Sequence, residues 1–121
     1  MIVKLEKPIV GFKKVMKLRY PKPYARYLKP YDTRVIELII PAGALVHYPD
    51  PRELDNTWFK LRASEAYVAK GNGKSSHDFL FKYREGEIVK PESKFSRVNK
   101  TCASGIHFFL DPEEAALYNF G

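Results

Sequence analysis

The chain has 121 residues, of which 45% are hydrophobic and 14% aromatic, and a formal net charge of +7. This composition is typical of a globular domain and excludes an intrinsically disordered chain. The single cysteine, Cys102, excludes an internal disulfide and a cysteine-rich zinc site, and it suits a reducing compartment. No apolar run approaches the roughly 20 residues that span a bilayer, and no signal-peptide pattern follows Met1. We therefore expect one globular domain over residues 1–121, soluble and intracellular.

The positive charge is concentrated in the first part of the chain. Residues 1–34 hold ten Lys or Arg against two Asp or Glu, whereas residues 35–121 carry a net charge of −1. The basic character therefore belongs to the N-terminal part and not to the whole surface, which favours an anionic partner for that part.

Short runs of β-branched, aromatic and alternating apolar residues predict a series of short strands. A glycine interrupts the second run at Gly11, where a bulge or a close approach of another segment is expected. Turn residues at 71–76 and at Gly86 separate the later runs. The strands are predicted near residues 1–6, 9–15, 35–40, 44–48, 58–62, 66–69, 79–83, 87–90 and 106–110.

The strongest local pattern lies near the C-terminus. A buried strand over residues 106–110 is predicted to end at Asp111, which is a good N-cap, and Pro112 suits the first helical position. Glu114 is placed to complete a capping box with Asp111. One helix beside many short strands places the chain in the α+β class, mostly antiparallel β with a C-terminal strand–turn–helix unit.

A segment rich in tyrosine, proline and basic residues occupies positions 20–31. Its prolines exclude a continuous helix or a central strand. Basic side chains neutralise phosphates and tyrosine rings stack on bases, which predicts contacts with nucleic acid or a nucleotide. Equally, the tyrosines can pack on the sheet while the lysines stay in water. The predicted contact residues lie in this segment and in the basic stretch before it: Lys13, Lys14, Lys17, Arg19, Lys22, Tyr24, Arg26, Tyr27 and Lys29.

Several blocks of the chain resemble an uncharacterised domain of phages and large DNA viruses that is often attached to pentapeptide-repeat proteins. The resemblance implies a viral or phage setting and no established activity. Leu61 stands where that family usually carries a cysteine, and residues 20–31 look like an insertion. The blocks are IVGFKK at 9–14, VIELIIPAGA at 35–44, KLRASEA at 60–66, SHD at 76–78, YREGEIVKP at 83–91 and CASGIHFF at 102–109, with Tyr118.

The stretch Gly105-Ile-His-Phe108 is also similar to a strand of ADP-ribosyltransferases whose tyrosine stacks on nicotinamide. His107 occupies that position here, and the resemblance implies a cleft with Tyr118 or Tyr83 nearby. Arg62 and His47 are the guesses for its upstream basic residue, and no late catalytic glutamate can be identified. The alternative is that His107 simply points away from the core, which Ile106 and Phe108 face.

His47, His77 and His107 lack the close spacing of a metal site, so three unrelated histidines are the better interpretation. Residues 71–76 lack the pattern of a phosphate-binding loop, and a turn is favoured there. We expect no metal and no cofactor.

The leading hypothesis is a viral accessory protein of the infected host cytoplasm, without a membrane partner, that binds nucleic acid, a nucleotide-type ligand or an acidic protein surface. It would act without catalysis, in a role that includes countering host defence. The alternatives are a divergent ADP-ribosyltransferase-like enzyme and a structural component of the virion. Whether the chain forms a homo-oligomer stays open.

Overall fold

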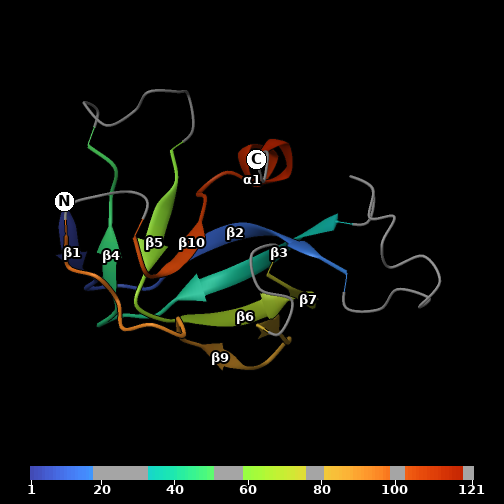
Figure 1. Cartoon of the computed structure of the whole chain (residues 1–121), viewed down its shortest axis with the longest axis horizontal. Coiled ribbons are helices and arrows are strands. Elements are labelled where there is room, and N and C mark those ends of the chain that lie inside the picture. Colours follow the sequence, from blue (N-terminus) through green and yellow to red (C-terminus); the bar gives the residue numbers. More distant parts are fainter. Residues whose placement is uncertain (18–32, 51–58, 76–80, 99–102, 119–121) are drawn as a thin grey trace.

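A computed structural model describes residues 1–17, 33–50, 59–75, 81–98 and 103–118. Two antiparallel sheets dominate these residues (Figure 1). The smaller sheet has four strands in the order β1-β4-β5-β10, and the larger sheet has six in the order β8-β7-β2-β3-β6-β9.

The four-stranded sheet combines strands from both ends of the chain. Its outer strand β1 pairs with β4, and β5 lies between β4 and β10. Both neighbours of β5 run antiparallel to it, so residues opposite each other share a face of the sheet. The strands are β1 (Ile2–Lys4), β4 (Leu45–His47), β5 (Leu61–Ala63) and β10 (Ile106–Phe108).

The six-stranded sheet is built around the long hairpin of β2 (Ile9–Met16) and β3 (Thr33–Ile40), which pair along their whole length. β6 (Ala66–Lys70) continues the sheet beyond β3, with an irregular register at Glu37 and Leu38. The remaining strands are short: β7 (Gly73–Lys74), β8 (Lys82–Tyr83) and β9 (Ile88–Val89). β8 and β9 do not pair with each other, because β8 pairs with β7 and β9 with β6.

The hydrophobic core draws on both sheets. On β3, Ile36, Leu38 and Ile40 are buried while the residues between them are more exposed, as the two-residue period of a strand requires. Leu61 on β5 and Phe108 on β10 are fully buried in the same cluster. This shared apolar cluster holds the two sheets together.

A backbone connection also joins the sheets. Phe12 of β2 and Phe109, just after β10, exchange two hydrogen bonds of 2.7 Å. At this crossing Phe108 packs directly on Gly11, where a side chain would collide with its ring. The predicted close approach at Gly11 is therefore found, and it allows β10 to lie against β2.

The helix α1 (Pro112–Leu117, Figure 1) follows this crossing and contacts β2 and β3. The Asp111 side chain accepts a hydrogen bond from Glu113 N at 2.9 Å, and Pro112 is the first helical residue, so the predicted start of the helix is confirmed. The predicted capping box is not formed. The Glu114 carboxylate instead accepts a hydrogen bond from the backbone N–H of Phe59.

The assignment to the α+β class is wrong. The described residues form a mostly antiparallel β structure, and their one helix has six residues. The strong capping signals at Asp111 and Pro112 fix where a helix starts, but they carry no information about its length or its share of the fold. Among the described residues no helix is long and apolar enough to cross a membrane.

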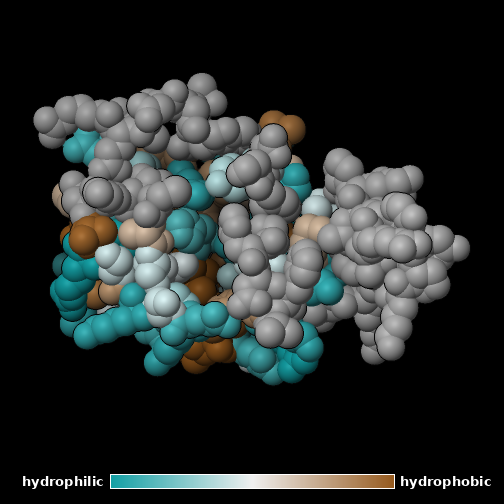
Figure 2. Space-filling view, in the orientation of Figure 1, coloured by the Kyte–Doolittle hydropathy of each residue, from teal (hydrophilic) through white to brown (hydrophobic). Residues whose placement is uncertain are grey.

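The outer face of the six-stranded sheet carries an apolar row. Val10, Ile39, Tyr67 and Ile88 lie opposite one another on four adjacent strands, and Ile88 is 64% exposed. In Figure 2, hydrophilic residues gather along the lower edge of the molecule and a brown patch interrupts them near β9. Not all apolar surface of this sheet is turned inward.

Candidate functional site

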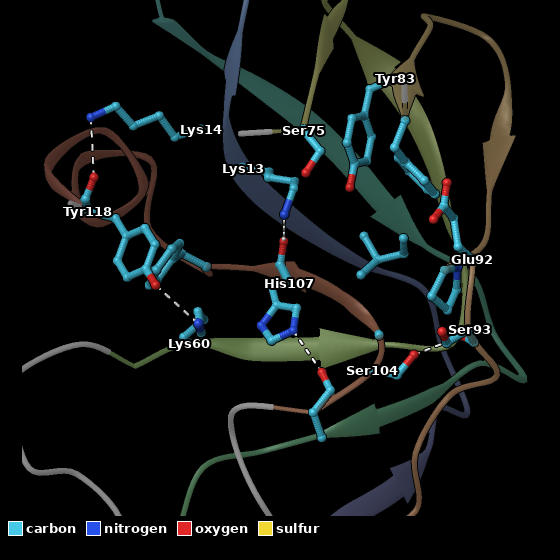
Figure 3. A pocket seen from close by; sticks show the side chains of 16 residues that line it. Lys13, Lys14, Lys60, Ser75, Tyr83, Glu92, Ser93, Ser104, His107 and Tyr118 are labelled. Carbon is cyan, nitrogen blue, oxygen red and sulfur yellow. Dashed lines mark hydrogen bonds between the residues drawn. The ribbon is translucent and has the colours of Figure 1, made fainter. Parts of the chain in front are cut away.

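A cavity of about 500 Å³ is lined by residues from both sheets and from the end of α1 (Figure 3). Its lining contains three lysines against one glutamate, together with several aromatic rings. Strands β2, β8 and β10 each contribute side chains, and two loops close the remaining side. The lining residues are Lys13, Lys14, Lys60, Ser75, Phe81, Tyr83, Pro91, Glu92, Ser93, Ala103, Ser104, Gly105, Ile106, His107, Phe109 and Tyr118.

Lys13 reaches the cavity from the inner face of β2. Gly11 and Val15, two residues before and after Lys13, are buried, and residues two apart on a strand share one face, so the Lys13 side chain points inward. Its Nζ donates a hydrogen bond to the carbonyl oxygen of His107 at 2.8 Å and lies 5.6 Å from the centroid of the Tyr83 ring. Burial, and secondarily the positive charge of Lys60, lower the pKa of Lys13 from 10.5 to about 7.

Two other lysines converge on Tyr118, the C-cap residue of α1. Lys60 Nζ donates to the phenolic oxygen of Tyr118 at 3.1 Å and lies 5.1 Å from the centroid of that ring. Lys14 Nζ donates to the Tyr118 backbone oxygen at 3.2 Å. Figure 3 shows these two contacts on either side of Tyr118. The helix end thus holds two ammonium groups, Lys60 at the Tyr118 ring and Lys14 at the Tyr118 backbone oxygen.

His107 lies near the centre of the residues drawn in Figure 3. Its Nε2 is 2.9 Å from the Ala103 carbonyl oxygen, which can only accept, so Nε2 carries the proton and Nδ1 keeps a lone pair. Nδ1 is buried and has no hydrogen-bond partner among the described residues. Burial, then the charges of Lys13 and Lys60, lower the pKa of His107 to about 3. The ring is therefore neutral at physiological pH.

The aromatic part of the lining includes Tyr83 and Phe81. Tyr83 is 3% exposed, and burial raises the pKa of its phenol above the usual range, so it stays protonated. The Phe81 and Tyr83 ring centroids lie 5.2 Å apart in a tilted arrangement. On the other side, Phe109 and Tyr118 form a second tilted pair at 5.1 Å. Two aromatic pairs therefore border the lysines.

Arg62 does not line the cavity. It lies between His47 and His107 in one row across β4, β5 and β10, on the face opposite the core. Its exposed fraction is 0%. Its guanidinium donates to the carbonyl oxygens of Ser96 at 2.6 Å, Ser104 at 3.0 Å and Val98 at 2.6 Å. The geometry makes Arg62 an anchor for the loop that covers this face.

The predicted contact residues divide into three groups. Lys13, Lys14 and His107 line the cavity, and Tyr83 and Tyr118 lie around it as the enzyme hypothesis requires. Lys17 directly follows β2 and does not line the cavity. The others, apart from the buried Arg62, lie outside the described residues: Arg19, Lys22, Tyr24, Arg26, Tyr27 and Lys29.

Lys60 was missed by sequence reasoning. It stands immediately before β5, and nothing in its sequence neighbourhood separates it from an ordinary surface lysine. Only the packing of α1 against this strand places Tyr118 over it. Of the predicted histidine trio, His77 lies outside the described residues, and no group of three or more His, Cys, Asp or Glu within the described ranges could hold a metal ion.

Comparison with known proteins finds a relative of viral origin. An uncharacterized protein of Acanthamoeba polyphaga mimivirus, L223, is 34% identical over 100 residues, which cover 69% of this chain. The chain spans 61% of the length of that relative. No solved structure matches the chain. The model of a family of unknown function, DUF5758, matches residues 1–115, and the chain therefore belongs to this family.

Proposed function

We propose that the protein is a non-catalytic binding module for a small anionic ligand of the nucleotide type. The observation that carries this proposal is that two lysines, Lys13 and Lys60, line the same cavity. Neither lysine has a carboxylate partner among the described residues. Two amines without a carboxylate partner in one cavity favour the binding of an anion, which would supply the missing negative charge.

The aromatic lining supports a ligand with a planar ring. The Tyr118 and Tyr83 rings border the cavity next to the lysines, so a phosphate and a base could be bound side by side. A phosphate near Lys13 would also stabilise its protonated form, so binding is expected to take up a proton around neutral pH.

Calorimetric titration with AMP, adenosine and inorganic phosphate tests this proposal. AMP should bind more tightly than either fragment, and its affinity should fall with rising salt. Lys60→Gln should weaken AMP binding by at least about tenfold, because one charge-assisted contact is lost. Lys82→Gln is the matched control, since Lys82 is exposed on β8 and does not line the cavity. Absence of binding at millimolar AMP, or equal losses in both variants, would overturn the proposal.

A second candidate is the divergent ADP-ribosyltransferase-like enzyme. The observation that favours it is that His107 borders a cavity together with Tyr118 and Tyr83. Release of nicotinamide from NAD is the direct assay. Turnover that disappears in His107→Ala would support the enzyme, and intact NAD after prolonged incubation would remove it.

The basic N-terminal part of the chain supports a proposal that the protein binds a macromolecule. Its ten basic residues against two acidic ones favour nucleic acid or an acidic protein surface. A role against host defence, attachment to pentapeptide repeats and a structural role in the virion belong to the same viral setting. Native mass spectrometry of the purified protein tests the nucleic-acid partner: a bound nucleic acid supports it, and a clean protein mass argues against it.

A further inference from the structure

The amine of Lys13 is placed unlike that of a surface lysine. It stands in the wall of the cavity, between β10 and the Tyr83 ring (Figure 3). Among the described residues, its hydrogen-bond partner is the His107 carbonyl oxygen, and no carboxylate pairs with it. A second lysine, Lys60, borders the same space.

This setting favours the neutral amine. Desolvation penalises the ammonium form, the charge of Lys60 adds to that penalty, and the pKa of Lys13 is about 7. A neutral lysine has two N–H bonds and one lone pair. One N–H is used by the His107 carbonyl, which leaves the lone pair available to a molecule in the cavity. Lysines made nucleophilic by desolvation and a neighbouring cation follow this pattern.

We propose that Lys13 is a nucleophile that captures a small anionic aldehyde or ketone in this cavity as an imine. The lone pair of Nζ forms the new N–C bond with the carbonyl carbon. The C=O bond breaks, and its oxygen leaves as water with the two hydrogens of the amine. The step is hydrolytically reversible and needs no oxidant or reductant.

Lys60 gives the cavity a preference among carbonyl compounds. Its ammonium group is fixed by the Tyr118 hydroxyl at 3.1 Å and borders the same cavity, where it can pair with a carboxylate or phosphate on the same molecule. The cavity therefore favours ligands that carry both an anionic group and a carbonyl. This inference rests on the same cavity as the proposed function, but it does not require that the ligand is a nucleotide.

The test is reductive trapping on the wild-type protein. Glyoxylate, a small anionic aldehyde, is added at low concentration with cyanoborohydride, and the modified lysines are identified by peptide mass spectrometry. Fragment spectra separate Lys13 from the adjacent Lys14. At pH 7 about half of an amine with a pKa of about 7 is neutral, against about one in 3,000 for an ordinary lysine. Lys13 is therefore expected to be modified at least about tenfold faster than the exposed Lys82.

The pH dependence gives a second readout on the same protein. Modification of Lys13 should level off above about pH 7, because most of its amine is then neutral. Lys60→Gln should move the Lys13 plateau to higher pH, because a neighbouring positive charge is removed. Lys82→Arg is the control and should leave the modification of Lys13 unchanged.

Modification of Lys13 at or below the rate of Lys82 from pH 6 to 9 would overturn the inference. A parallel AMP titration separates the two proposals. Trapping at Lys13 without AMP binding keeps the nucleophile and rejects the nucleotide, and AMP binding without trapping does the reverse.

Discussion

Lys13 Nζ donates to the His107 carbonyl oxygen at 2.8 Å, and this hydrogen bond links the six-stranded sheet to the four-stranded sheet. The donor is a buried amine whose pKa is about 7 in the folded protein, against 10.5 for an ordinary lysine. Because folding changes the proton affinity of this group, the bond has consequences for stability.

The first prediction concerns the pH dependence of unfolding. Between pH 7 and 10 the unfolded state binds the Lys13 proton and the folded state does not, so the free energy of unfolding should rise with pH. The contribution of one such group is at most about 1.4 kcal/mol per pH unit. Lys13→Met removes it. Any stability advantage of this variant should therefore be largest at pH 7 and should shrink towards pH 9.5.

Urea unfolding of the wild type and of Lys13→Met at several pH values measures this difference. The series stops below pH 10, because the raised pKa of Tyr83 makes stability fall again where the unfolded phenol ionises. Lys82→Met, at an exposed position, is the control, and its curve should run parallel to that of the wild type. Parallel curves for Lys13→Met as well would show that the amine is not desolvated in the folded protein.

The second prediction concerns Arg62. The planar guanidinium of Arg62 donates hydrogen bonds to three carbonyl oxygens. Lysine cannot reproduce this geometry and would leave buried acceptors without a hydrogen bond. We expect Arg62→Lys to lower the free energy of unfolding by about 2–4 kcal/mol. Denaturant unfolding measures the loss, with Arg84→Lys at an exposed position as the control. A loss below about 1 kcal/mol would contradict the anchoring role.

The third prediction concerns the contact of Gly11 with Phe108. A Cβ at residue 11 would overlap the Phe108 ring, so Gly11→Ala should be destabilising by about 1–3 kcal/mol. Combining it with Phe108→Leu should cost less than the sum of the single changes, because the smaller side chain makes room. Thermal unfolding of the four proteins closes the cycle. Val10→Ala, on the exposed face of the same strand, is the control, and strict additivity would speak against the overlap.

Local chemistry explains which features the sequence predicted. The alternation in β3, the N-cap at Asp111 and the close approach at Gly11 depend on neighbouring residues or on one missing side chain. His107 also points away from the core side that Ile106 and Phe108 occupy, as the simpler interpretation expected. These properties are set within a few residues, so they can be recognised without the fold.

The remaining features depend on distant segments. Glu114 had the correct spacing for a capping box. Its carboxylate instead accepts a hydrogen bond from the backbone N–H of Phe59, because α1 packs near the start of β5. Lys60 belongs to the cavity only because Tyr118, 58 residues later, packs over it. The small share of helix in the fold likewise depends on the length of α1, which is only six residues. No capping residue determines that length.

The crossing of β2 with the segment that follows β10 also constrains folding in time. Lys13 and His107 are 94 residues apart, and Lys14 and Tyr118 are 104 apart. Contacts of such long range form slowly, because a large loop must close first. During synthesis the cavity cannot be complete until Tyr118, one of its lining residues, has left the ribosome.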